Sequence, residues 1–460
     1  MTTEHHTGAL SGATTMTADL DAGATTAADL LDAALRAVRT APARNALITT
    51  TSERAEREAV SSDQRRARGA PLSPLDGVPI TYKDLFDVEG TVTTGGSQSR
   101  LGTGAARRDS ALVARCAALG MVTVGKTNLS EFAFSGLGVN TFFGTPVGPV
   151  HGGTPRVAGG SSSGAAVSVG TGVAPIAVGT DTSGSIRIPA AWCGLVGYRA
   201  SRNRYGPNDF LPLSQTLDCV GVIGSTVGDV RLFDETVRGQ PPVPCSPADV
   251  PSGLRLVVAS GELVDSCSPG IAAAFAAVLT ALSEAGISIT ARRFSSLDDA
   301  QTLMDSCGTV VGHEAGPNIL GRGLDTRRMQ AATLRRLERS ARANVGPARL
   351  YGQLPELRRR FRAELGDAIL VCPTVRIPPP PVSAVLDDPE RHDEANLQAL
   401  RSTMVLSYLG ACGLSCPAPA FAGESGLLLS GAHGDDDQLL CAAATVENVL
   451  SRPSMAGGWS

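Results

Sequence analysis

Short apolar runs alternate with amphipathic stretches along most of the chain, and this alternation limits the folds that the sequence can adopt. The runs at 254–259, 287–289 and 368–373 have the length and the Val, Ile and Leu content of buried strands. Stretches at 26–38 and 269–285 have helical periodicity, and Thr26 and Asp29 are spaced as a capping box. The pattern predicts an α/β fold whose central sheet is largely parallel.

Two regions depart from this alternation. Residues 1–24 are rich in Thr, Ala and Gly, and we expect them to form a disordered tail ahead of a single domain at 25–455. Within that domain, residues 298–365 are rich in arginine and lack strong strand signals. We interpret 298–365 as a helical, cap-like excursion over the edge of the sheet.

Composition argues against several functional classes. A formal net charge of -4 gives no overall field that favours nucleic acid or an anionic membrane. No apolar run approaches the length of a membrane span, and the chain begins without the pattern of a signal peptide. We therefore expect a cytoplasmic protein that binds neither nucleic acid nor membrane, with its ten cysteines as free, buried thiols.

Only two of the forty basic residues are lysine, namely Lys83 and Lys126. Arginine replaces lysine at most surface positions, but a buried ammonium loses its proton far more readily than a guanidinium does. Lys83 ends a strand-like apolar run at 77–84, where burial would make it a neutral amine able to act as a base. We interpret Lys126 as a structural residue that pairs with carbonyls or an acid, with a second catalytic group as the alternative.

Two turns rich in glycine and serine, at 159–164 and 179–187, flank one helix–strand unit. Ser185 follows a buried strand at the mouth of the next helix, where α/β proteins commonly place reactive groups. A serine hydroxyl needs a base before it becomes a good nucleophile, and no histidine lies in a recognisable triad context. Lys83 therefore remains as the candidate base. Taken alone such turns are usually structural, and a phosphate-binding role is disfavoured because the P-loop pattern is absent.

The two turns together resemble the amidase signature, and segment 77–84 resembles the lysine segment of the same family. Ser161 and Ser185 stand 24 positions apart, which is the spacing of that family. Segments 122–132, 211–218 and 427–447 resemble further family motifs, so the similarity extends over most of the chain. The resemblance implies a three-layer α/β/α fold, in which helices flank a large, mixed and mostly parallel central sheet. It also implies a serine amidohydrolase without metal or organic cofactor.

The resemblance also implies a role for each motif residue. Ser185 would be the nucleophile, Ser161 the bridging serine in a cis peptide, and Lys83 the base. The oxyanion hole would consist of the backbone N–H groups of Thr182, Ser183, Gly184 and Ser185. The supporting residues would be Gly160, Asp181, Arg187 and Lys126, of which we expect Asp181 and Arg187 to form a hydrogen-bonded or ion-paired brace. The family commonly has Gly-Gly-Ser at the nucleophile turn, whereas this chain has Ser183-Gly184-Ser185.

We therefore expect hydrolysis of a small carboxylic amide to an acid and ammonia or an amine. The alternatives are the glutaminase subunit of a tRNA-dependent amidotransferase, an allophanate-type hydrolase and a non-catalytic scaffold that binds ligands without turning them over. The substrate pocket is expected to take its walls from 298–365 and from loops near 132–143 and 205–210. The sequence does not distinguish a monomer from a homodimer.

Overall fold

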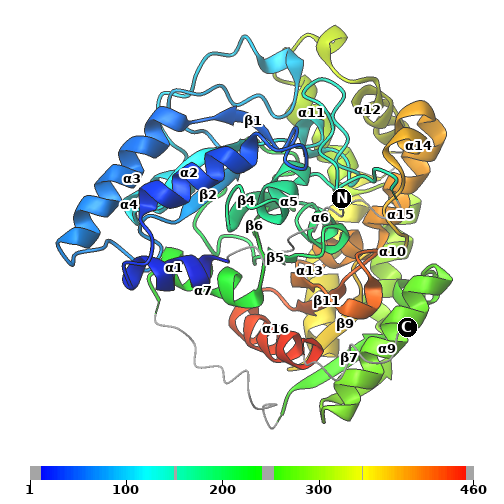
Figure 1. The fold of residues 1–460 in the computed structure, drawn as a ribbon. Helices are drawn as coiled ribbons and strands as arrows, with labels where there is room; N and C mark the ends of the chain where they lie inside the picture. Colours follow the sequence, from blue (N-terminus) through cyan, green and yellow to red (C-terminus); the bar gives the residue numbers. More distant parts are fainter. Residues whose placement is uncertain (1–11, 150–152, 241–252, 344–345, 452–460) are drawn as a thin grey trace.

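The computed structural model describes residues 12–149, 153–240, 253–343 and 346–451, and its centre is a sheet of 11 strands. The strands, labelled in Figure 1, follow the order β1-β3-β2-β4-β6-β5-β10-β11-β9-β7-β8 across the sheet. Their bounds are β1 Leu47–Thr50, β2 Pro79–Lys83, β3 Val122–Thr127, β4 Ile176–Asp181, β5 Val196–Arg199, β6 Cys219–Gly224, β7 Arg255–Ala259, β8 Ser288–Arg292, β9 Ile369–Pro373, β10 Cys412–Cys416 and β11 Leu427–Gly431. The predicted α/β fold with a large mixed sheet is confirmed.

The sheet is less parallel than the sequence pattern predicted. Parallel pairs lie toward its two ends, in β3-β2-β4 and in β9-β7-β8. The five pairings between β4 and β9 in this order are antiparallel, and so is the pairing of β1 with β3, which makes six of the ten described pairings antiparallel. The sequence pattern left β5, β6 and β10 unrecognised, because these short strands contain glycine, which weakens the strand signal.

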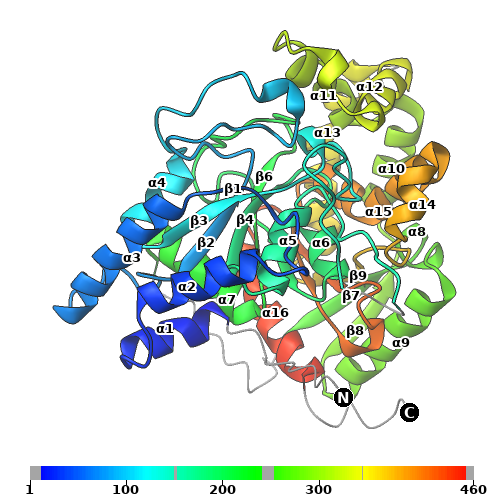
Figure 2. The ribbon, with the colours of Figure 1, turned by 45° about the horizontal axis from the view of Figure 1, so that its top comes forward.

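Helices cover both faces of the sheet (Figures 1 and 2). The α-helices are α1 Ala13–Asp21, α2 Ala27–Val38, α3 Ser52–Ala67, α4 Ala111–Ala118, α5 Ser163–Gly170, α6 Arg187–Trp192, α7 Val227–Arg238, α8 Glu262–Asp265, α9 Pro269–Glu284, α10 Ser295–Cys307, α11 Val310–Leu320, α12 Ala331–Ala343, α13 Pro347–Leu365, α14 Val382–Asp387, α15 Pro389–Tyr408 and α16 Asp436–Leu450. Short 3-10 helices are Gln98–Arg100, Glu131–Ala133, Thr326–Arg328 and Pro419–Phe421.

The two helical layers follow from the alternation of side chains along each strand. In β9, Val371 joins the apolar core that includes α4, α7, α9 and α16. Its neighbours Leu370 and Cys372 join a second core with α10, α11, α13 and α15. Successive strand residues point to opposite faces, so a strand that is apolar throughout needs a helical layer on each side.

The N-terminal segment departs from the expected disordered tail, because Ala13–Asp21 form α1. The backbone N–H and the hydroxyl of Thr14 donate to Asp229 Oδ1 on α7, at 2.9 and 3.0 Å. This carboxylate satisfies a backbone donor in the first turn of α1 that has no partner within the helix. A composition rich in Thr and Ala does not reveal such a distant partner. Residues 1–11 of the predicted tail lie outside the described residues.

Residues 298–365 are helical as predicted, since α10 to α13 account for most of them. Figure 2 shows α11 and α12 at one side of the molecule, beyond the strands. Helix α2 begins with the predicted capping box, in which Thr26 Oγ1 accepts from Asp29 N at 3.0 Å. Helix α3 has Thr51 as its N-cap, without a side-chain hydrogen bond there.

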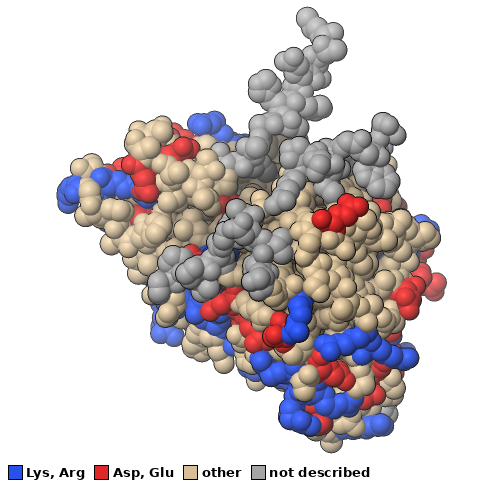
Figure 3. Space-filling model, turned by 90° about the horizontal axis from the view of Figure 1, so that it is seen from below, with Lys and Arg blue, Asp and Glu red and all other residues tan. Residues whose placement is uncertain are grey.

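Eight described cysteines are free, and six of those are buried. Cys441 is disulfide-bonded, which corrects the expectation that every cysteine is a free thiol. The spacing of cysteines along a chain does not tell which sulfur atoms meet in space. Among the described residues, no helix is both long and apolar enough to cross a membrane. On the face drawn in Figure 3, basic and acidic side chains are interspersed.

Candidate active site

Lys83 lies at the end of β2 and is fully buried. Its Nζ is 2.7 Å from Ser161 Oγ and 2.9 Å from Thr180 Oγ1. No carboxylate among the described residues lies within ion-pair distance of this nitrogen. Burial lowers the pKa of Lys83 to about 7, while the more distant charges of Asp218 and Asp181 act in the opposite direction. A neutral amine is therefore accessible near neutral pH.

The Gly160–Ser161 peptide bond is cis, as the family resemblance implied. A Cβ at position 160 would lie 2.4 Å from Gly138 N, so only glycine fits there. Ser162 N donates to Ser185 O at 3.1 Å, and this bond joins the two Gly/Ser turns. The fold thus places Ser161 between the strand that carries Lys83 and the turn that carries Ser185.

Ser185 sits in the turn between β4 and α6 and lines a cavity. Gly184 adopts φ +126°, and a Cβ there would lie 2.1 Å from Thr403 Oγ1. Ser183 is not among the described residues with positive φ, so its backbone conformation does not require the glycine that is common in the family. The turn therefore accommodates this departure from the family pattern without backbone strain.

The predicted oxyanion hole needs one correction. Gly184 N already donates to Asp181 Oδ1 at 2.8 Å, so it is not free to bind a developing oxyanion. The N–H groups of Thr182, Ser183 and Ser185 donate to no other described residue. Because all three residues line the cavity, their N–H groups remain the candidate donors.

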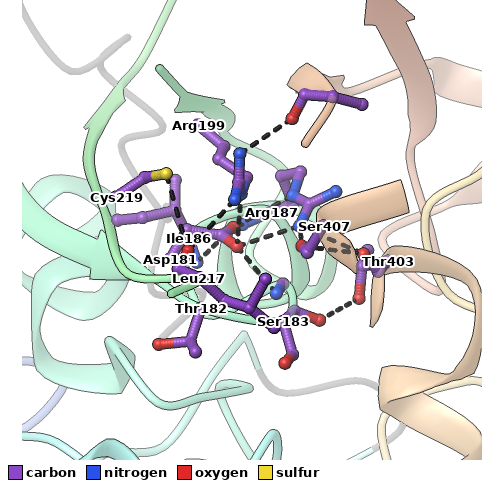
Figure 4. Close-up of polar contacts among 12 residues, drawn as sticks. Asp181, Thr182, Ser183, Ile186, Arg187, Arg199, Leu217, Cys219, Thr403 and Ser407 are labelled. Atoms are coloured by element: carbon purple, nitrogen blue, oxygen red, sulfur yellow. Dashed lines mark hydrogen bonds and ion pairs between the residues drawn. The ribbon is translucent and has the colours of Figure 1, made fainter. Parts of the chain in front are cut away.

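Asp181 and Arg187 form the predicted ion-paired brace beneath this turn (Figure 4). The Arg187 side chain donates to both oxygens of Asp181 at 2.9 Å, and Arg199 Nε lies 3.4 Å from Asp181 Oδ1. Burial by itself would raise the pKa of Asp181, but the two arginines outweigh it and hold the pKa at about 2. A carboxylate that stays ionised at neutral pH fixes the turn by accepting from Gly184 and Ile186.

Lys126 is also fully buried but has a carboxylate partner, in agreement with its interpretation as a structural residue. Its Nζ is 2.5 Å from Asp84 Oδ1 and also donates to Thr93 Oγ1 at 2.8 Å. Burial raises the pKa of Asp84 and lowers that of Lys126, and the ion pair opposes both shifts. Neither Lys126 nor Asp84 lines the cavity at Ser185.

Two residues at the site, Asp218 and Thr180, had no role predicted from the sequence. Thr180 contacts Lys83 Nζ through its hydroxyl. Asp218 Oδ1 accepts from Thr182 Oγ1 at 2.6 Å, and Oδ2 accepts from Leu213 N and Ser214 N. Burial raises the pKa of Asp218 to about 6, although these hydrogen bonds act in the opposite direction. Asp218 stands in the family-like segment 211–218, but that motif alone does not show its contact with the nucleophile turn.

The cavity at Ser185 has a volume of about 200 Å³. Its lining is Ala133, Phe134, Ser135, Thr182, Ser183, Ser185, Leu213, Gly308, Thr309, Val311, Gly312, Arg336, Arg339, Ser340, Ala343, Asn396, Leu397, Leu400 and Met404. The walls expected from 298–365 and from the loop after position 132 are present. The wall expected from 205–210 is absent from this lining, and α15 supplies one that was not predicted. No metal-binding cluster of His, Cys, Asp and Glu occurs among the described residues.

Comparison with known proteins identifies the family. The sequence matches the Amidase family over residues 29–440. The chain belongs to the amidase signature family. Its fold agrees with a crystal structure of an amidase that is 27% identical, with a TM-score of 0.84 over 96% of this chain and 100% of that chain.

Named relatives in this family act on different molecules. The 2-amino-5-chloromuconic acid deaminase of Comamonas testosteroni is 32% identical over 93% of each chain. A glutamyl-tRNA(Gln) amidotransferase subunit of Chloroflexus aggregans is 34% identical over 65% of this chain and 63% of its own length. The protein is therefore an amidase-signature hydrolase of amide carbon–nitrogen bonds.

Proposed function

We propose that this amidase-family protein hydrolyses a small carboxylic amide through an acyl-enzyme on Ser185, with Ser161 relaying protons to Lys83. The observation that carries the proposal is the Lys83 environment. Its Nζ is 2.7 Å from Ser161 Oγ, has no described carboxylate in contact, and has a pKa lowered to about 7 by burial. A structural lysine would have an acidic partner, as Lys126 does.

Each step of the proposed reaction uses groups already described. Neutral Lys83 takes a proton from Ser161, which takes the proton of Ser185 as its Oγ attacks the amide carbon. The carbonyl oxygen becomes an oxyanion that accepts hydrogen bonds from the N–H groups of Thr182, Ser183 and Ser185. The proton then passes back to the leaving nitrogen, the carbon–nitrogen bond breaks, and ammonia or an amine departs.

The second half of the reaction reverses these roles. A water molecule gives its proton to the same relay and attacks the Ser185 ester. The carbon–oxygen bond to Ser185 breaks, the proton returns to Ser185 Oγ, and the carboxylic acid leaves. Both halves use one base, one nucleophile and one oxyanion site, so no redox partner is required.

Covalent labelling tests the nucleophile directly. A fluorophosphonate probe should label the wild-type protein at Ser185, with the site located by mass spectrometry, and Ser185→Ala should abolish labelling. Ser183→Ala is the matched control, because Ser183 lines the same cavity two positions away and should leave Ser185 reactive. Labelling that persists in Ser185→Ala would overturn the assignment.

The amidotransferase alternative is supported by the relative of that name. A subunit that delivers ammonia to a partner should hydrolyse free amides poorly when purified alone. Steady hydrolysis by the isolated chain would favour the amidase proposal.

The allophanate-type alternative would require a substrate preference for allophanate over simple amides. The non-catalytic alternative would require a folded protein that the probe does not label.

A further inference from the structure

The cavity beside Ser185 has an unbalanced charge. Its described lining includes two arginines on α12, Arg336 and Arg339, and contains neither aspartate nor glutamate. All other described lining residues are apolar or neutral. A molecule bound in this cavity therefore lies near cations without a compensating acid in the wall.

The carboxylate of Asp393, on α15, is already paired with other side chains. Arg339 Nη2 donates to Asp393 Oδ2 at 2.6 Å, and Arg335 Nε lies 3.8 Å from the same oxygen. His392 Nδ1 lies 3.3 Å from Asp393 Oδ1. No described carboxylate lies within ion-pair distance of Arg336, so this arginine of α12 has no ion-pair partner among the described residues.

Arg336 is held in place by packing rather than by polar contacts. Its Cζ lies 5.3 Å from the centre of the Phe134 ring, a cation–π distance. Its Nη2 is buried and has no hydrogen-bond partner among the described residues. Burial lowers the pKa of Arg336 to about 10, so the guanidinium is still charged at neutral pH. A buried, unpaired donor on a charged group is costly, and an anionic ligand would remove that cost.

Asn396 adds a second oriented group to the same cavity. Its Oδ1 accepts from Ser135 Oγ at 3.0 Å and from Gly136 N at 2.8 Å. These two bonds fix the side-chain amide, and its Nδ2 donates to no other described residue. Arg336 and Asn396 therefore both offer N–H donors on residues that line the cavity.

We propose that the substrate is an amide carrying a second group, a carboxylate, which Arg336 binds while Ser185 attacks the amide carbon. The identity of the reacting amide rests on the proposed function. A guanidinium matches a carboxylate with two parallel hydrogen bonds. Phe134, Leu213 and Met404 line the cavity and suit a short hydrocarbon segment, and the volume of about 200 Å³ suits a small molecule.

The same lining argues against an amino-acid amide. An ammonium group in the cavity would meet Arg336, which has no ion-pair partner among the described residues, and would find no acidic side chain in the described wall. Like charges near each other in a partly dry site are repulsive. The monoamide of a dicarboxylic acid therefore fits better than glutamine, which has the same carbon chain as the glutarate monoamide but adds an ammonium.

Three amides of one chain length test the proposal: pentanamide, glutaramate and L-glutamine. Wild-type kcat/KM should be at least about tenfold higher for glutaramate than for the other two. Arg336→Gln should lower kcat/KM for glutaramate by about 10- to 100-fold. The ratio of kcat/KM for glutaramate to kcat/KM for pentanamide should then approach one. Arg342→Gln is the matched control, because it removes one exposed arginine of the same helix outside the lining and should leave the ratio unchanged. Succinamate and adipamate extend the series to shorter and longer chains.

Calorimetric binding of succinate, glutarate and adipate to Ser185→Ala separates this proposal from the proposed function. Saturable binding of one dicarboxylate that Arg336→Gln weakens at least tenfold would support the carboxylate site even if no amide is hydrolysed. The proposal is overturned if none of the three binds, if Arg336→Gln leaves their binding unchanged, or if the wild type prefers pentanamide or glutamine. Failure of fluorophosphonate labelling would instead count against Ser185 as the nucleophile.

Discussion

The two lysines of the chain are both fully buried, on neighbouring strands, yet their surroundings differ in kind. Lys83 Nζ contacts the hydroxyls of Ser161 and Thr180, whereas Lys126 Nζ contacts the carboxylate of Asp84. Asp84 directly follows Lys83, and adjacent residues of an extended chain point to opposite sides. A lysine among hydroxyls can lose its proton, while a lysine paired with a carboxylate is held as a structural cation.

The largest expected effect follows from changing Lys83. Lys83→Arg should abolish turnover while the protein stays folded, because a guanidinium does not act as a base near neutral pH. Lys83→Met is a second variant of smaller volume, and it should lower kcat by on the order of 10⁴-fold. Single-turnover kinetics and circular dichroism would separate lost chemistry from lost folding. Turnover by a folded Lys83→Arg variant would contradict the relay.

Lys126 should show the opposite behaviour. Lys126→Met leaves Asp84 buried without its partner, which should destabilise the fold by about 3–5 kcal/mol in urea unfolding. The double variant Asp84→Asn, Lys126→Met should recover much of that stability, because the amide introduced at position 84 is neutral and its oxygen can still accept from Thr94 N. If Lys126→Met kept the stability of the wild type but no longer hydrolysed an amide, Lys126 would take part in catalysis.

The pH profile sharpens the comparison further. Because Lys83 must be neutral to accept a proton, kcat/KM should fall about tenfold per pH unit below a pKa near 7 and level off above it. Asp218 is a negative charge that raises the pKa of Lys83, so Asp218→Asn should move this limb to lower pH. Asp229→Asn is the distant control and should leave the limb in place. A limb that moves upward in Asp218→Asn would refute the assigned direction.

The smallest effect is expected at Ser183, where the chain departs from the family pattern. Ser183→Gly should keep fluorophosphonate labelling within about threefold, because the N–H donor is retained, and should cost about 0.5–1 kcal/mol of stability through backbone entropy. Gly184→Ala is the contrasting change, since its Cβ would lie 2.1 Å from Thr403 Oγ1, and it should lose labelling. A large loss in Ser183→Gly would indicate that its hydroxyl contributes to the site.

Features that depend on contiguous residues could be predicted from the sequence. The alternation of apolar runs predicted the α/β fold. The two Gly/Ser turns and the scarce lysine indicated Ser185 and Lys83 as candidate catalytic residues, and the resemblance to the amidase signature family added Ser161. The glycines at positions 160 and 184 stand in these motifs, but the contacts that exclude a side chain there, with Gly138 and Thr403, exist only in the folded chain.

Which polar groups are occupied and which are free became clear only from the folded chain. Gly184 N donates to Asp181, Asp218 accepts from Thr182, Asp393 accepts from Arg339, and Arg336 Nη2 has no hydrogen-bond partner among the described residues. These contacts join segments that are far apart in the chain, and a hydrogen bond or ion pair depends on distance in space rather than on sequence pattern. The reaction class was therefore visible in short motifs, whereas the charge of the substrate pocket emerged only when α12, α15 and the nucleophile turn were brought together.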